Sequence, residues 1–202
     1  MLARLTRTTL KRKIHVRWSS TVDDPDVDVL LEQSDCGMWA TLILNRPQTH
    51  NALSQGVIDG FYKHLNTLQT QESLPRAVFL RAAGGKTFCA GGDLKKMLAS
   101  GGQSRQANTD EAMHLSGIFA ALRAFPRPMI ALVDGPCFGG GVGIISSCDM
   151  AFATADSKFA LSEVLLGVIP GMYLQLLQLL QLPLQVPLQV PSLLPPLLLL
   201  PL

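Results

Sequence analysis

The sequence predicts a single α/β domain made of repeated strand–helix units. Between residues 27 and 153, short apolar or β-branched runs alternate with segments whose apolar residues recur at helical spacing. Two glycine-rich stretches, Phe88–Asp93 and Gly135–Gly143, each follow such a run and precede a helical pattern. With 202 residues, 48% of them hydrophobic, the chain is long enough to bury one sizeable core and too short for two.

The first predicted elements are two paired strands and a helix. Residues 27–33 and 38–44 have the composition of strands and flank the turn-rich tetrapeptide 34–37. Ser54 is expected to cap a helix that ends before Pro75. The apolar positions of this helix are Val57, Ile58, Phe61, Leu65 and Leu68.

Three more strands and three more helices complete the prediction. The strands are expected at 76–81, 128–133 and 150–153. One helix follows the first glycine-rich stretch, a second spans about 109–124, and a third runs from the second stretch to about Ser147. The expected core contacts of the second helix are Met113, Ile118, Ala121 and Leu122.

The first 21 residues have the composition of a mitochondrial transit peptide, since no acidic residue precedes Asp23. A basic amphipathic helix and a nucleic-acid-binding arm are the alternatives. Removal of this segment would leave a chain of net negative charge, so we expect a location in the mitochondrial matrix and no nucleic-acid partner. The basic residues are Arg4, Arg7, Lys11, Arg12, Lys13 and Arg17.

Residues 171–202 form a low-complexity tail of mostly Leu, Pro and Gln, without a charged residue. Its prolines would interrupt a membrane-spanning helix, so we expect no membrane partner. Its short near-repeats resemble a translated nucleotide repeat or a frameshift, and we expect the native reading frame to end near Gly171.

The cysteines have neither a C-x-x-C spacing nor histidine companions at ligand spacing, so the sequence predicts no metal site and no disulfide framework. We expect them to be small buried residues. A nucleophilic cysteine paired with His50, His64 or His114 is the alternative, and we rank it lower. The cysteines are Cys36, Cys89, Cys137 and Cys148.

The two glycine-rich stretches together predict an oxyanion hole. Each stretch places backbone N–H groups near the start of a helix, where a developing negative charge is stabilised. Glycine allows a carbonyl oxygen to approach the peptide nitrogen closely, because no side chain crowds the site. The first hypothesis is therefore an enzyme that activates a thioester.

Four ordered blocks resemble the crotonase superfamily, the enoyl-CoA hydratase and isomerase family. The likeness covers residues 27–170, and four blocks in order are far less expected by chance than one glycine motif. The blocks are Leu44–Pro47 with His50–Leu53, Phe88–Met97, Gly135–Asp149, and Phe159–Glu163 with Leu166–Pro170.

The resemblance implies a crotonase-like spiral of ββα units over residues 22–170, here truncated. It implies a homotrimer or hexamer if the native C-terminal part were present. The substrate would be an acyl-CoA thioester, with coenzyme A as part of the substrate and no separate cofactor. By position, Gly92 and Gly140 would donate their N–H groups to the thioester oxygen.

The resemblance also assigns proton transfer to Glu163, whose sequence neighbours are mostly apolar. Substrate contacts would come from Ala90, Gly139, Lys95 and Arg46, with the two basic residues nearest the nucleotide end of coenzyme A.

Four acidic residues near these motifs have other predicted roles. Asp93 and Asp149 are expected to hold loops through backbone amides. Asp110 and Glu111 could supply a further acid, but we favour an electrostatic role near a helix start.

One departure from the family pattern concerns the activity. Hydratases with two glutamates carry the second acid where this chain has Gly143. The remaining pattern looks most like methylglutaconyl-CoA hydratase-like members, in branched-chain amino-acid or fatty-acid breakdown, and least like the hydrolases, which have a proline before the glutamate.

Two alternatives remain open. One is a 3-hydroxyisobutyryl-CoA hydrolase-like thioesterase. The other is an inactive truncated product, which would leave the site wet and would show poor solubility and little turnover.

Overall fold

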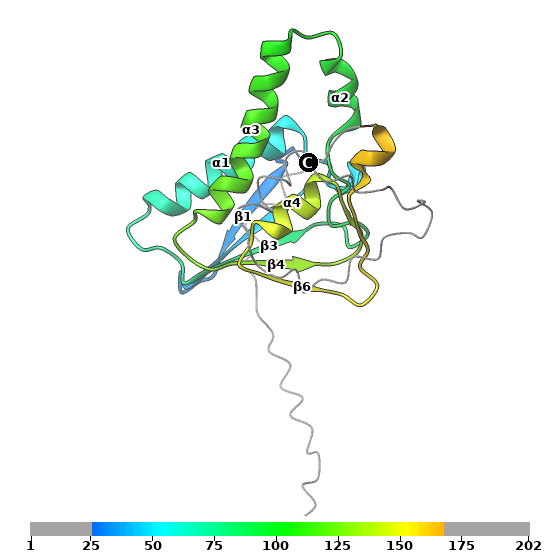
Figure 1. The fold of residues 1–202 in the computed structure, drawn as a ribbon. Coiled ribbons are helices and arrows are strands. Elements are labelled where there is room, and N and C mark those ends of the chain that lie inside the picture. Colours follow the sequence, from blue (N-terminus) through cyan, green and yellow to red (C-terminus); the bar gives the residue numbers. More distant parts are fainter. Residues whose placement is uncertain (1–25, 168–202) are drawn as a thin grey trace, which may run out of the picture.

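The computed structural model describes residues 26–167 (Figure 1). The predicted transit peptide, the low-complexity tail and the last residues of the fourth sequence block lie outside the described residues. Of the helices in the described part, none is both long and apolar enough to cross a bilayer.

The main sheet has the strand order β1-β2-β3-β4-β6. β1 (Val29–Gln33) and β2 (Trp39–Leu44) are antiparallel. β3 (Ala77–Ala82), β4 (Met129–Val133) and β6 (Met150–Ala153) then join in parallel. The strand predictions are therefore confirmed, and the parallel pairs place a helical crossover between successive strands.

The α-helices lie on one side of this sheet, as Figure 1 shows. α1 (Gln55–Thr70) and α3 (Arg105–Arg123) contact each other, and the short α4 (Gly140–Ser146) lies beside them. α2 (Leu94–Ser100) and the first part of α3 form an arm that rises above the body (Figure 1). Two 3₁₀ turns, η1 (Pro47–Thr49) and η2 (Ser162–Leu166), complete the described elements.

Helix α1 agrees with its prediction in detail. The Ser54 hydroxyl accepts a hydrogen bond from the Val57 amide at 3.2 Å, which satisfies a donor that the first helical turn leaves free. All five predicted apolar positions are buried. Burial of each such side chain contributes about 1.5–3 kcal/mol, so this face anchors the helix to the sheet.

A second, two-stranded sheet was not predicted. β5 (Cys137–Phe138) and β7 (Phe159–Ala160) pair in parallel, and an isolated bridge joins Cys89 to Cys137. Strands of two residues are too short to show an alternating pattern in sequence. This small sheet brings residues 159–163 beside the two glycine-rich stretches, so it organises the candidate site.

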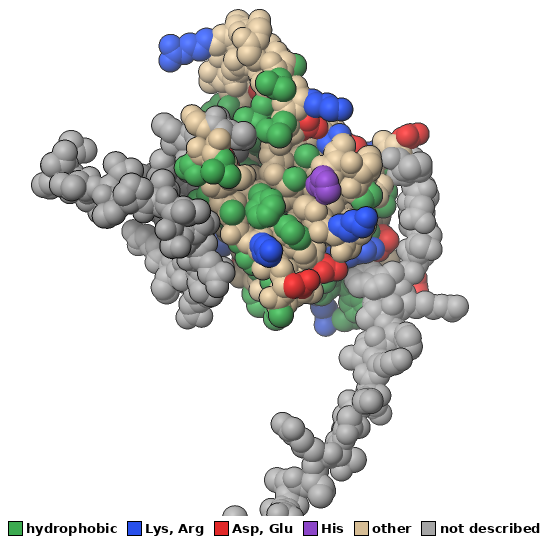
Figure 2. Space-filling model, turned by 90° about the vertical axis from the view of Figure 1, so that its right-hand side faces the viewer, with side chains coloured by type: hydrophobic (Ala, Val, Ile, Leu, Met, Phe, Trp, Pro, Cys, Tyr) green, Lys and Arg blue, Asp and Glu red, His purple; other side chains and the backbone are tan. Residues whose placement is uncertain are grey.

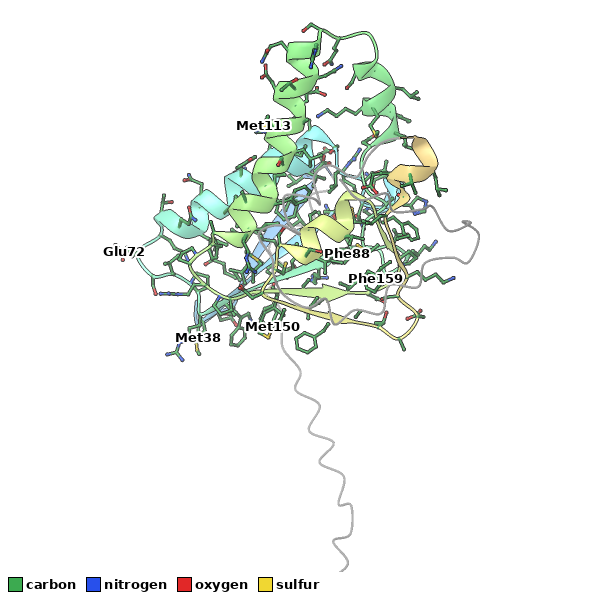
Figure 3. The ribbon with its side chains drawn as sticks, in the orientation of Figure 1. Met38, Glu72, Phe88, Met113, Met150 and Phe159 are labelled. Atoms are coloured by element: carbon green, nitrogen blue, oxygen red, sulfur yellow. The ribbon has the colours of Figure 1, made fainter. Side chains whose placement is uncertain are left out.

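Two expectations about the core are wrong. Met113 is 67% exposed, because it lies on the part of α3 that projects with the arm (Figure 3). α3 begins at Arg105, after the Ser104 cap, and only its second half covers the sheet. Cys36 is exposed in the turn between β1 and β2, whereas the other three cysteines are buried as expected.

His64 makes the stability of the fold dependent on pH. Its ring Nε2 lies 2.9 Å from the Val29 carbonyl oxygen, which ties α1 to β1. Burial lowers the pKa of His64 from its ordinary value of 6.5. The folded state therefore resists protonation more than the unfolded state does, and its stability is fully present above pH 6.5.

We expect the free energy of unfolding to decrease as the pH falls from 6.5 through the folded-state pKa of His64. Urea unfolding of the wild type and of His64→Gln at several pH values tests this. Glutamine can keep the hydrogen bond to Val29 without titrating, so the variant should lose this part of the pH dependence. Equal pH profiles would contradict the assignment.

Candidate functional site

The two glycine-rich stretches lie side by side. We call Phe88–Asp93 the first glycine stretch and Gly135–Gly143 the second. The Phe88 amide donates to the Pro136 carbonyl at 2.9 Å, and the Phe138 amide donates to the Cys89 carbonyl at 2.8 Å. Two segments separated by about fifty residues in sequence therefore share one hydrogen-bonded ladder.

A third segment, His50–Leu53, holds the first stretch from another side. The Leu53 amide donates to the Gly91 carbonyl at 2.8 Å, and the Ala90 amide donates to the His50 carbonyl at 3.0 Å. The amide of Gly92, which follows Gly91, takes no part in these bonds. Within residues 26–167, no hydrogen bond is donated by the N–H of Gly92 or of Gly140. Both N–H groups that are predicted to form the oxyanion hole can therefore donate a hydrogen bond to a ligand.

Gly91 is the point at which the two stretches touch. Its φ of +92° belongs to the left-handed region, which favours glycine. A Cβ atom added there would lie 3.1 Å from the Phe138 carbonyl oxygen and 3.4 Å from the Gly140 amide nitrogen. A side chain at this position would therefore push the stretches apart.

The requirement for glycine differs between the two expected donors. A Cβ on Gly140 would meet Leu53 Cδ1 at 2.6 Å, so the buried Leu53 side chain would have to move. A Cβ on Gly92 would meet only the flexible Met97 sulfur, at 3.3 Å. Packing within the protein is therefore tighter at Gly140 than at Gly92, and the crowding of a thioester oxygen by a side chain at either donor stays a prediction.

Glu163 lies against the second glycine stretch. Its Oε1 is 3.2 Å from the position of a Cβ on Gly139, the residue before Gly140. The Gly139 amide is held by the Ala160 carbonyl at 2.9 Å, which fixes this proximity through the β5–β7 pair. Glu163 Oε2 is buried and has no hydrogen-bond partner. A buried acceptor without a partner reduces the stability of the fold. This oxygen can therefore gain from a hydrogen bond with a ligand or from binding a proton.

Two apolar sequence neighbours of Glu163 lie at the surface. Val164 is 59% exposed and Leu165 is 85% exposed, because the 3₁₀ turn directs them to the surface. Figure 2 faces the side on which α2 and η2 lie, and hydrophobic side chains gather over it. The exposed apolar residues of these two elements are Leu94, Met97, Leu98, Val164 and Leu165.

Asp110 and Glu111 do not lie near a helix start as expected, because α3 begins at Arg105 and has no acidic residue in its first turn. Asp110 accepts a hydrogen bond from Gln106 at 2.8 Å, and Glu111 accepts one from Ser100 at 3.1 Å, both within the arm. Asp149 accepts from the Met129 amide at 2.8 Å, which confirms its expected role. Gly143 is buried in α4 and offers no side chain. Glu163 is thus the carboxylate that the fold places beside Gly139.

The Arg46 side chain stabilises the fold through contacts within the protein. Its guanidinium makes ion pairs with Asp28 at 3.2 Å and Asp93 at 3.3 Å, and it donates to the Ala52 carbonyl at 3.0 Å. Asp93 in turn caps α2 by accepting from the amides of residues 95 and 96. Burial raises the pKa of Asp93, but the hydrogen bonds from Arg46 and from the two amides, with the charge of Arg46, together outweigh it and lower the pKa. The contact of Arg46 with coenzyme A stays a prediction.

The other residues predicted to contact substrate differ in whether their polar groups are available for binding. The Ala90 amide already donates to the His50 carbonyl, so a contact of Ala90 with substrate stays a prediction. Lys95 is exposed at the start of α2, two residues after the Asp93 cap, so its ammonium group is accessible. Gly139 is close to Glu163 and directly precedes Gly140, and its contact with substrate stays a prediction.

Arg46→Ala is expected to reduce the free energy of unfolding by about 2–4 kcal/mol, because it strands two carboxylates that are 28% and 17% exposed. Arg46→Lys should restore only part of this, since lysine cannot bridge both partners with a planar fork. Urea unfolding measures both changes.

Arg81→Ala is the control, since that guanidinium is 38% exposed and makes one ion pair at 3.5 Å. We expect a loss of at most about 1 kcal/mol there. Equal losses at the two arginines would contradict the scaffold role of Arg46.

The three buried cysteines are unsuited to thiolate chemistry, whereas the hydrogen bond with Ser34 lowers the pKa of the exposed Cys36. Burial raises the pKa of Cys89 and of Cys148 to about 12, and that of Cys137 still further. These thiols therefore stay protonated near neutral pH. No group of three or more His, Cys, Asp or Glu side chains in the described part is placed to hold a metal ion.

Comparisons with known proteins agree with this architecture. The family model described as enoyl-CoA hydratase/isomerase matches residues 39–177. An enoyl-CoA hydratase from Shewanella pealeana has a solved structure with a TM-score of 0.70 and 31% identity, covering 77% of this chain and 57% of that one.

Two curated relatives carry different activities in their names. A mitochondrial 3-hydroxyisobutyryl-CoA hydrolase of mouse is 36% identical over 77% of this chain and 39% of its own length. An enoyl-CoA hydratase of Alternaria alternata is 37% identical over 64% of this chain and 41% of its own. Hydrolases are thus as similar as hydratases in overall identity, although Ser162 stands where we expected them to have proline.

The chain spans about two fifths of the length of these curated relatives. The matched segment contains both glycine stretches and Glu163, and its mixed α/β fold agrees with the solved relatives. The chain belongs to the enoyl-CoA hydratase/isomerase family of the crotonase superfamily.

Proposed function

We propose that this chain is an enoyl-CoA hydratase or isomerase that acts on a short acyl-CoA thioester. One observation carries the proposal: the Glu163 carboxylate, with a buried oxygen that has no partner, lies against Gly139, and the nearby glycine stretches hold two backbone amides, those of Gly92 and Gly140, that donate to nothing within the described residues. This combination suits a reaction in which a proton moves while negative charge develops on a carbonyl oxygen.

The thioester oxygen would accept hydrogen bonds from the amides of Gly92 and Gly140. These bonds strengthen as the carbonyl becomes an enolate, and each is worth about 3 kcal/mol in the transition state. In isomerisation, Glu163 would take a proton from C2 and return it to C4. In hydration, it would take a proton from water as the oxygen attacks C3, and it would return that proton to C2.

A thioester hydrolase is the second candidate. It is favoured by the similarity to 3-hydroxyisobutyryl-CoA hydrolases and by Gly143, which leaves one acid for the reaction. Glu163 would then activate water for attack on the thioester carbon, and the same amides would stabilise the tetrahedral oxyanion. The products would be a free acid and coenzyme A.

An acyl-CoA panel separates these activities. We expect the 202-residue chain to consume crotonyl-CoA or methylglutaconyl-CoA without release of thiol. Release of free thiol from 3-hydroxyisobutyryl-CoA, without hydration of either enoyl substrate, would favour the hydrolase. A folded chain that turns over neither class would support an inactive product.

The proposal includes no separate cofactor, a mitochondrial matrix location, and a homotrimer or hexamer for the complete protein. The location is supported by the mitochondrial hydrolases of mouse, rat and cow among the relatives. Methylglutaconyl-CoA, fatty-acid or branched-chain substrates belong to the same proposal, and the acyl panel tests them.

A further inference from the structure

Two buried thiols lie at the junction of the glycine stretches. Cys89 and Cys137 are bridge partners, and both are fully buried. The Gly91 amide donates to Cys89 Sγ at 3.4 Å. Cys89 therefore controls the amide that directly precedes the expected donor Gly92.

The same thiols support the second stretch. A Cβ added to Gly141 would lie 2.7 Å from Cys89 Cβ, 2.9 Å from Cys137 Sγ and 3.0 Å from Cys89 Sγ. The first turn of α4, which begins with Gly140, thus rests directly on both side chains. Cys89 contacts the backbone of each stretch next to its predicted oxyanion donor.

We propose that Cys89 is a positioning residue for the oxyanion site, an inference that rests on the proposed function. Its sulfur holds the Gly91 amide, so it fixes the approach of the backbone to Gly92. Its side-chain volume also determines how closely Gly141 packs against the first stretch, and hence where Gly140 lies. Alanine would remove the acceptor and leave a gap, whereas a larger side chain would collide with Gly141.

The first test is the kinetics of Cys89→Ala with crotonyl-CoA. We expect kcat to fall about tenfold at nearly unchanged KM, a fraction of the 10²–10³-fold loss for removing a whole donor. Cys148→Ala is the matched control, since that buried thiol bonds the Ile144 carbonyl at the far end of α4. It should leave kcat unchanged. A wild-type kcat in Cys89→Ala would overturn the proposal.

The second test does not need turnover. Hydrogen exchange followed by NMR should show a slowly exchanging Gly91 amide in the wild type and a faster one in Cys89→Ala. Cys89→Ser keeps an acceptor and should restore part of the protection. Unchanged exchange in Cys89→Ala would overturn the proposal. An inactive wild type that shows these exchange differences would refute the proposed function alone.

Discussion

Replacing Glu163 by glutamine is expected to lower kcat for hydration of crotonyl-CoA by about 10³-fold, equivalent to roughly 4 kcal/mol of activation free energy. Glutamine keeps the shape of the side chain and its contact with Gly139, but it cannot accept a proton at neutral pH. KM should change little, because the backbone amides that hold the thioester remain. The loss of the conjugated enoyl absorbance measures kcat and KM directly.

Asp110→Asn and Glu111→Gln are matched controls for this prediction. Both remove a negative charge from the arm, where the carboxylates bond Gln106 and Ser100. We expect both variants to retain wild-type kcat. A loss in Glu111→Gln as large as that in Glu163→Gln would contradict the assignment of proton transfer to Glu163 alone.

Replacing Gly91 by alanine is expected to lower kcat by about 10²-fold and to reduce the free energy of unfolding by about 1–3 kcal/mol. The new methyl group would press on Phe138 and on the Gly140 amide, and the backbone would be strained at a φ of +92°. Both effects separate the two donors. Steady-state kinetics and urea unfolding measure them in the same preparation.

Gly37→Ala distinguishes strain from crowding. Gly37 has a φ of +66°, but a Cβ there would meet nothing within 4 Å. This variant should lose about 1 kcal/mol of stability and keep its kcat. If Gly91→Ala behaved in the same way, contact between the stretches would not matter for the reaction.

Elements with a strong repeating pattern could be predicted from the sequence. Helix α1 is an example, since Ser54 indicates where the helix begins and five apolar positions indicate its buried face. Strands β3 and β4 followed from apolar runs that lead into glycine. In each case a local pattern and the tertiary packing favour the same structure.

Features that depend on contacts between distant segments could not be predicted. The β5–β7 pair joins residues some twenty positions apart through two residues each. Met113 fits the period of α3, yet the first half of this helix projects beyond the sheet and contains none of its buried residues. A periodic pattern shows which residues share a face, but it does not show where the neighbouring layer ends.

The candidate site was predicted in its components but not in its geometry. Gly92, Gly140 and Glu163 were named from the motifs, and the fold gathers their segments around Gly139. The roles of Gly91, Cys89 and Arg46 arise from distances between segments, for which the sequence carries no local signal. Arg46 illustrates the difficulty, because a basic residue near a motif has the same appearance whether it binds substrate or scaffold.

The central claim is that Glu163 transfers a proton to or from C2 of a thioester held by the two glycine stretches. The most direct test is the exchange of the C2 protons of butyryl-CoA in D₂O, followed by NMR, because it requires neither water addition nor a double bond. We predict that the wild type incorporates deuterium at C2 and that Glu163→Gln is slower by about 10³-fold. Equal exchange by both proteins, or none by a wild type that binds butyryl-CoA, would contradict the claim.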